Sequence, residues 1–143
     1  MANYLLTPIK NFKELKAKVG RELQYYSHVI TSPHGGRLSD EARPIIRRLA
    51  VELEEKYLLV PSGYVLTRLK IIPKKEAVIS AKGSMIRISN SIGDNGSTDA
   101  NMLDLMTIYT KLDIDELDER NNQKYATAKE LFKLIDHPCK EPE

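Results

Sequence analysis

The chain has almost no cysteine and lacks tryptophan altogether. Its one thiol, Cys139, stands among 143 residues, and the aromatic residues are seven Tyr and two Phe. One cysteine excludes an intramolecular disulfide and a cysteine-based zinc site, and it fits a reducing compartment. We therefore expect a mainly aliphatic core, with the tyrosines at its edges.

Long apolar runs are also missing. No stretch approaches the roughly 18 apolar residues of a membrane span. The apolar start, Met1–Ile9, is followed at once by Lys10 and Lys13, so it does not match a secretory signal. We expect a cytoplasmic protein without a membrane partner. The length predicts a single domain over residues 1–137, followed by a flexible tail over residues 138–143.

Motifs for catalysis or metal binding are absent from the sequence. The three histidines, His28, His34 and His137, have no partner at the spacing of a helical zinc site. The glycine-containing loop after residue 32 lacks the Gly-Lys-Ser/Thr of a phosphate-binding loop. From Asp94, the twelfth position of a calcium loop falls on Leu105 instead of Glu. We expect neither an enzyme nor a bound metal or cofactor.

The two signs of charge are separated along the chain. Residues 1–90 hold 16 Lys and Arg against 8 Asp and Glu, whereas residues 91–143 hold 6 against 12. The net charges are thus +8 and −6, and such asymmetry favours a polyanion partner for the basic part. In the alternative interpretation, acidic and basic helices simply pack beside each other in one molecule.

Apolar residues at steps of three and four predict two N-terminal helices. The first begins with Asn11 as its cap, and Gly20 within it permits a close helix contact. Its apolar stripe consists of Phe12, Leu15, Val19, Leu23, Tyr26 and Ile30. The second helix begins at Ser39 and buries Ile45, Ile46, Leu49, Leu53 and Tyr57. Before them, Asn3–Thr7 is predicted as an edge strand or an extended arm that ends at Pro8.

The middle of the chain is predicted to form a small antiparallel sheet of three or four strands. The strands are residues 57–60, 64–72, 77–81 and 85–89, and a turn at Lys82-Gly83 joins the last two into a hairpin. Two C-terminal helices follow. Ser97 or Thr98 caps one of them, and the other begins with the capping box of Asp113 and Glu116. The fold class predicted from the sequence is therefore α+β.

The segment from Leu38 to Ile88 resembles a winged helix-turn-helix over about a third of the chain. A helix ending in Leu53-Glu54-Glu55-Lys56 runs into Tyr57-Leu58-Leu59-Val60, then a turn and Tyr64-Val65-Leu66-Thr67. Tyr57 departs from the pattern, because glycine is common at this place. The resemblance implies DNA binding, with helix arginines in a major groove and wing residues on phosphates. The expected nucleic-acid-binding residues are Arg43, Arg47, Arg48, Arg68, Lys70, Lys74, Lys75 and Lys82.

An acidic cluster at the start of the last predicted helix supports a different function. Its expected protein-interaction residues are Asp113, Asp115, Glu116 and Asp118. We predict a small nucleic-acid-associated regulatory or accessory protein with DNA or RNA as partner. The alternative is a non-enzymatic interaction module, such as an adaptor, inhibitor or immunity-type protein. It would use the acidic helices or the sheet edge to bind a protein partner or a second copy of the chain.

Overall fold

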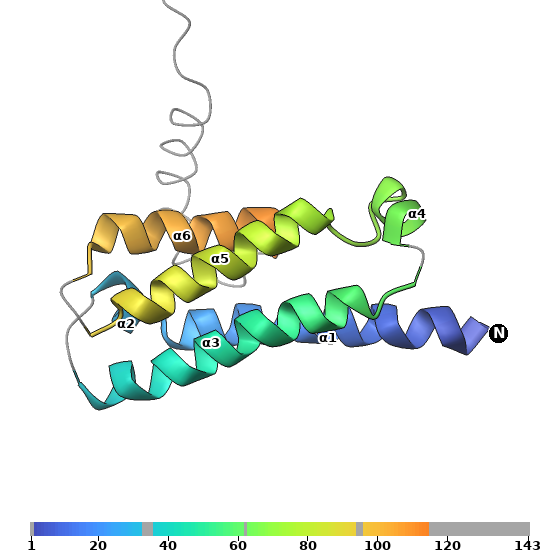
Figure 1. The fold of residues 1–143 in the computed structure, drawn as a ribbon. Helices are drawn as coiled ribbons and strands as arrows, with labels where there is room; N and C mark the ends of the chain where they lie inside the picture. Colours follow the sequence, from blue (N-terminus) through green and yellow to red (C-terminus); the bar gives the residue numbers. More distant parts are fainter. Residues whose placement is uncertain (1, 33–35, 62, 94–95, 115–143) are drawn as a thin grey trace, which may run out of the picture.

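The computed structural model describes residues 2–32, 36–61, 63–93 and 96–114. This part of the chain forms the helices α1 (Ala2–Tyr25), α2 (Ser27–Thr31), α3 (Arg37–Leu58), α4 (Gly63–Arg68), α5 (Lys75–Ser91) and α6 (Thr98–Leu112). Four of them are long, while α2 and α4 are short and lie at opposite ends of the molecule (Figure 1). No strand occurs in the described ranges, so the predicted α+β class is wrong and the fold is all-α.

Hydrogen bonds between α3 and α5 show that these two helices are antiparallel. Arg47, in the middle of α3, donates to Asn90 near the end of α5. At the other end, the Tyr57 hydroxyl donates to the main-chain oxygen of Pro73, just before α5, at 3.0 Å. The pairing therefore runs from the end of one helix to the start of the other.

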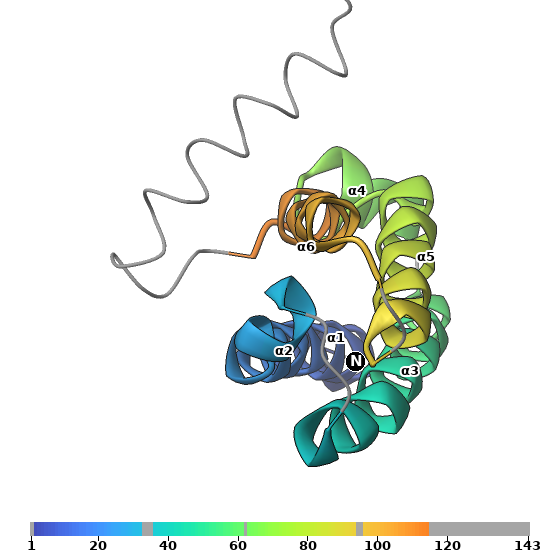
Figure 2. The same cartoon turned by 90° about the vertical axis from the view of Figure 1, so that its left-hand side faces the viewer.

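The pair of α5 and α6 is antiparallel as well. Arg87 binds the carboxylate of Asp104 through Nη2 at 2.7 Å and through Nε at 3.0 Å. One turn later on α5, the Ser91 hydroxyl donates to Oδ1 of Asn101. Seen along their axes, α1, α3, α5 and α6 surround a common centre (Figure 2). The result is an up-and-down bundle, a common all-α solution, in which α2 and α4 lie within two of the three connections.

The apolar stripe predicted for the first helix forms one wall of the core. All six of its members are buried, and four of them are at most 1% exposed. The Phe12 ring packs edge-on against Tyr57 of α3 with 5.6 Å between the ring centroids. On α3, Ile46, Leu49 and Leu53 are buried and Ile45 is partly buried against them. The burial of both predicted stripes is confirmed, but the first predicted helix is divided, because α1 ends at Tyr25 and Ile30 lies on α2 (Ser27–Thr31).

The predicted hairpin over residues 77–89 is instead the long helix α5. Its buried side chains are Val78, Ala81, Met85, Ile88 and, just beyond the last turn, Ile92, each at most 1% exposed. They recur at steps of three and four, which is the period of a helix and not of a strand. Many of the residues here are β-branched, and Lys82-Gly83 has the composition of a turn. The burial of a continuous helical stripe overrides both local preferences.

The predicted strands over residues 57–60 and 64–72 are wrong too. Residues 57 and 58 complete α3, and residues 63–68 form α4. Since the wing of a winged helix-turn-helix is a strand pair, the predicted resemblance to that family is not supported. The predicted sheet edge, which was one of the two interaction surfaces, is absent from the described residues as well.

The N-terminal segment is also helical. Residues 3–7, predicted as a strand or arm, belong to α1, which continues through Pro8 without a break. A proline inside a helix removes one intrahelical hydrogen bond, and here it does so close to the helix start. Asn11, predicted as the cap, therefore lies within the helix.

The end of α6 returns the chain to α1. Ser97 caps the start of α6 as predicted, because its hydroxyl accepts a hydrogen bond from the backbone N–H of Ala100 at 3.4 Å. Beyond the helix, Ile114 lies directly on Gly20 of α1. A Cβ on Gly20 would come within 3.0 Å of Cγ2 of Ile114. The predicted close contact at Gly20 is thus confirmed. The last predicted helix and the tail lie outside the described residues.

Candidate anion-binding site

The predicted basic surface is divided between two places. Arg43, Arg47, Arg48 and Lys82 lie on α3 and α5, whereas Arg68, Lys70, Lys74 and Lys75 lie on α4 and around the start of α5. From Lys74 to Asn90, the partner of Arg47, α5 rises by about 24 Å. The eight residues therefore do not form a single site.

Of the four residues on α3 and α5, Arg47 and Lys82 are engaged with neighbouring side chains, whereas Arg48 is exposed. Arg47 donates to Asn90. Lys82 forms an ion pair with Glu54, and the two side chains are 29% and 33% exposed. Arg43 is half-buried. The contacts of Arg47 and Lys82 connect α3 to α5 at the surface of the bundle.

The connection from α4 to α5 brings lysines to a concave site. Lys70 and Lys74 line it together with Lys16 from α1 and Lys111 from the last turn of α6. The site has a volume of about 260 Å³ and its other lining residues include the apolar Ile71, Ile72 and Ala77. We call Lys16, Lys70, Lys74 and Lys111 the lysine site. Asp113 supplies its one carboxylate.

The C-terminal ends of α4 and α6 meet at the lysine site, and both have the same hydrogen-bond geometry. At each end, one backbone N–H donates a hydrogen bond to the carbonyl three residues earlier, and the next N–H donates to the carbonyl five residues earlier. Lys70 N–H donates to Thr67 and Ile71 N–H to Leu66, at 3.0 and 2.9 Å. This pattern is a Schellman motif, whose left-handed residue is usually glycine.

At the lysine site those left-handed positions carry side chains. Lys70 has φ 58° and Asp113 has φ 51°, and among the described residues these are the two non-glycine residues with positive φ. A left-handed conformation costs a non-glycine residue of order 1 kcal/mol or more, and such residues cluster at functional sites. Both lie in the lining of the same site. This coincidence marks the site as a functional candidate.

The electrostatics of the site favour an anion. Lys70 and Lys74 are exposed, and the start of α5 has no side-chain cap at Lys74. The partial positive charge at the start of α5 is opposed by the partial negative charge at the C-terminal ends of α4 and α6, so the preference for an anion depends on the four lysines. Lys16 donates from Nζ to the main-chain oxygen of Asp113 at 3.3 Å, so it also stabilises the end of α6.

Half of the lysine site was missed in the sequence. Lys70 and Lys74 were predicted as nucleic-acid-binding residues, whereas Lys16 and Lys111 were not. They come from distant parts of the chain, and only the antiparallel packing of α1 and α6 brings them to the α4–α5 connection. No local motif could have indicated this.

The predicted acidic surface is described in part only. Asp113 is exposed at the end of α6 and lines the lysine site. Asp115, Glu116 and Asp118 lie outside the described residues. Asp113 therefore lies at the lysine site, although the sequence predicted it as part of a separate protein-interaction surface.

Two further observations concern metals and membranes. Within the four described ranges, no group of three or more His, Cys, Asp or Glu is placed to hold a metal ion. None of the helices there is long and apolar enough to cross a membrane. Comparisons of the chain with models of protein families, with curated proteins and with solved structures give no match.

Proposed function

We propose that the protein is a small nucleic-acid-associated regulatory or accessory protein, and that the lysine site binds backbone phosphates of DNA or RNA. The observation that carries the proposal is the convergence of Lys16, Lys70, Lys74 and Lys111 on one concave site. The net charge of the described residues also supports the proposal. The described ranges hold 17 Lys and Arg against 11 Asp and Glu, a net charge of +6.

The chemistry of the lysine site fits phosphate more closely than base recognition. Lysine carries a compact charge on a flexible stem and reaches phosphate oxygens as a point charge. Contacts of this kind position a protein on nucleic acid without reading sequence. Arg68 and Lys75, exposed beside the site, extend the positive surface. The proposed activity is therefore sequence-independent binding, without catalysis.

Fluorescence anisotropy with labelled duplex DNA, single-stranded DNA and RNA tests this proposal. The wild-type protein should bind at least one of them at low salt, and Lys70→Ala with Lys74→Ala should weaken that binding. The matched control is Lys18→Ala with Arg21→Ala, because both residues are exposed on α1 and line a different concavity. Absence of binding by the wild type at low salt would overturn the proposal.

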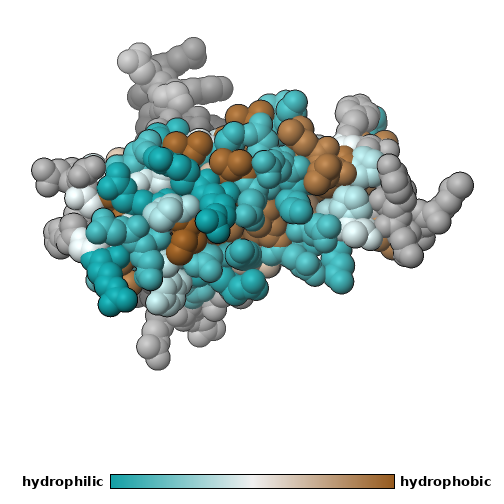
Figure 3. Space-filling model, turned by 60° about the horizontal axis from the view of Figure 1, so that its bottom comes forward, coloured by the Kyte–Doolittle hydropathy of each residue, from teal (hydrophilic) through white to brown (hydrophobic). Residues whose placement is uncertain are grey.

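A second function, contact with a second copy of the chain, is favoured by exposed apolar side chains around α4. Leu58, Leu59, Val65, Leu69 and Ile71 are 61%, 65%, 53%, 64% and 38% exposed. Figure 3 shows hydrophobic groups between hydrophilic ones on one face of the molecule. The five residues lie within residues 58–71, and a contiguous apolar patch on a protein surface marks an interaction site.

Light scattering after size-exclusion chromatography tests self-association. The measured mass should rise with concentration for the wild type and stay at the monomer value for Leu69→Asp. Val51→Asp is the control, since Val51 is 44% exposed on α3 outside this segment. A wild type that stays monomeric over the whole concentration range would exclude a homodimer.

A further inference from the structure

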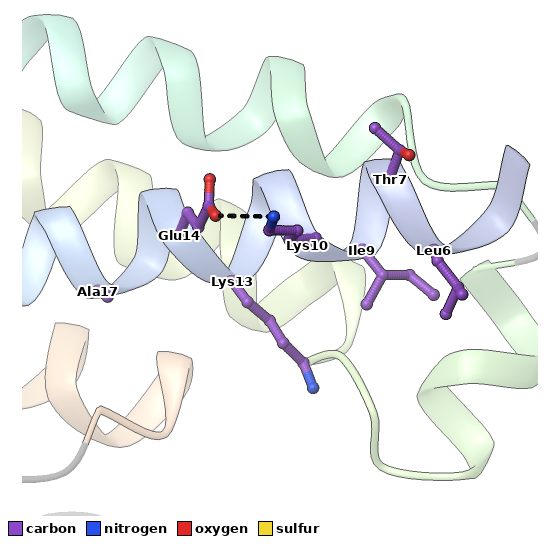
Figure 4. A pocket seen from close by; sticks show the side chains of 7 residues that line it. All are labelled: Leu6, Thr7, Ile9, Lys10, Lys13, Glu14 and Ala17. Carbon is purple, nitrogen blue, oxygen red and sulfur yellow. Dashed lines mark ion pairs between the residues drawn. The ribbon is translucent and has the colours of Figure 1, made fainter. Parts of the chain in front are cut away.

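The first half of α1 has an open apolar groove on its surface. Its lining residues all belong to α1: Leu6, Ile9, Lys13 and Ala17 recur at steps of three and four, with Thr7, Lys10 and Glu14 beside them, and its volume is about 640 Å³ (Figure 4). Leu6 is 59% exposed and Ala17 is exposed. The spacing means that one continuous face of the helix lines the groove. An apolar face of this kind is typical of a helix that receives another segment of chain.

The same face of α1 is already covered at one end. Gly20 follows Ala17 at a step of three, and Ile114 packs on it. The chain thus arrives at the C-terminal end of the groove at residue 114. Continuation of this contact toward Leu6 would extend an interface that the structure already contains.

We propose that the groove binds the chain's own residues 117–131, antiparallel to α1. From Gly20 back to Leu6 is 14 residues of helix, which is about 21 Å. The sequence predicts a helix over this part of the chain, and its 15 residues match that length. Its predicted apolar stripe includes Leu117, Tyr125, Ala128 and Leu131. The inference does not require the proposed binding of nucleic acid.

Charge and polarity match in this orientation. The segment enters with Asp115, Glu116, Asp118 and Glu119, all of them acidic. They follow directly on Asp113, whose main-chain oxygen already accepts a hydrogen bond from Lys16 of α1. In this register the acidic stretch lies near Lys16 and Arg21, the cations on the groove side at that level of α1.

The apolar part of the segment likewise pairs with the apolar end of the groove. An antiparallel pairing that begins with Ile114 on Gly20 brings Tyr125 and Ala128 toward Ile9 and Leu6. Burial of apolar side chains against the groove supplies the favourable free energy. A parallel pairing would instead bring the acidic stretch to the apolar end.

Cysteine cross-linking in the full-length chain tests the proposal. In a Cys139→Ser background, Lys13→Cys with Asn121→Cys should form an intramolecular disulfide under mild oxidation, because the pairing brings residue 121 close to residue 13. The control is Asn11→Cys with Asn121→Cys. Asn11 is exposed at the same level of α1 but lies about 160° around the helix.

The result expected is a monomeric cross-link that forms about tenfold faster or more for the Lys13 pair than for the Asn11 pair, since docking raises the effective concentration. Equal rates would overturn the proposal. A cross-link between two molecules would overturn it as well and assign the groove to a second copy of the chain.

Hydrogen exchange provides a second measurement that needs no cross-link. Leu6→Asp introduces a charge into the apolar end of the groove and should speed exchange in residues 125–131 about tenfold. Val51→Asp, an equally polar change at an exposed residue of α3, should leave that exchange unchanged. Unchanged exchange in Leu6→Asp, with the circular dichroism of a folded helical protein, would contradict docking.

Discussion

Asn101 holds the short helix α2 against α6, and its replacement is expected to destabilise the bundle. The side chain is 2% exposed. Its Nδ2 donates to the main-chain oxygen of Ile30 at 2.9 Å, and its Oδ1 accepts from the Ser91 hydroxyl. Ile30 lies in the last turn of α2, where carbonyls have no partner within the helix. Asn101 thus connects three helices through one amide.

The magnitude follows from these two hydrogen bonds. Asn101→Ala removes both, at a cost of about 1 kcal/mol each, and leaves a buried carbonyl without a partner at a further cost of about 1–3 kcal/mol. Since the hydroxyl of half-buried Ser91 also contacts the main-chain oxygen of Ile88 at 3.2 Å, part of this loss is recovered. We expect the free energy of unfolding to fall by about 2–4 kcal/mol.

Urea unfolding followed by far-UV circular dichroism measures this change. The matched control is Asn90→Ala, because Asn90 is exposed and its hydrogen bond partner is the exposed Arg47. A surface change of that kind should stay within about 0.5 kcal/mol of the wild type. If Asn101→Ala destabilised the protein no more than Asn90→Ala, the proposed connection of α2 to α6 would be refuted.

Three further changes test other parts of the structure. Gly83→Ala should stabilise the protein by about 0.5–1 kcal/mol in chemical unfolding, because α5 is helical there and the nearest atom to a new Cβ, Nη1 of Arg87, is 3.6 Å away. A hairpin turn at this glycine would give the opposite sign. Gly20→Leu should lower the free energy of unfolding by about 1–3 kcal/mol, because the new side chain displaces Ile114. The same change should cost less in a protein that already carries Ile114→Ala. If the double mutant lost the sum of the single effects, that contact would be excluded. Burial raises the pKa of the Tyr26 phenol above its ordinary value of 10.0. The folded state therefore keeps this proton longer than the unfolded state, and its contribution to stability is complete below about pH 10 and lost as the pH rises further. Tyr26→Phe should reduce the fall in stability measured between pH 9 and pH 11, and an unchanged fall would refute it.

The two core stripes of α1 and α3 could be predicted because their periodicity is long and uninterrupted. In α5 the same signal was present in Val78, Ala81, Met85 and Ile88, but β-branched residues and Gly83 suggested strands and a turn. Pro8 indicates a break, because a proline inside a helix removes one backbone hydrogen bond and clashes with the preceding turn, yet α1 continues through it. In α5, burial along the whole helix overrides these local preferences.

The lysine site could be predicted in part only, for a different reason. Lys70 and Lys74 lie close together in sequence, so their charge is visible as a local cluster. Lys16 and Lys111 join them through the packing of α1 and α6, which depends on the correct helical topology. The left-handed conformation of Lys70 was not predictable, because glycine is the usual signal for that position.

The salt dependence of nucleic-acid binding tests the central claim most directly. If the four lysines contact four phosphates of duplex DNA, the logarithm of the affinity should fall against the logarithm of the salt concentration with a slope of about −3.6. Lys70→Ala with Lys74→Ala should reduce the size of that slope by about 1.8, whereas Lys18→Ala with Arg21→Ala should leave it close to the wild-type value. An unchanged slope in the lysine-site variant, or an equal loss in the control, would contradict the assignment of phosphate binding to this site.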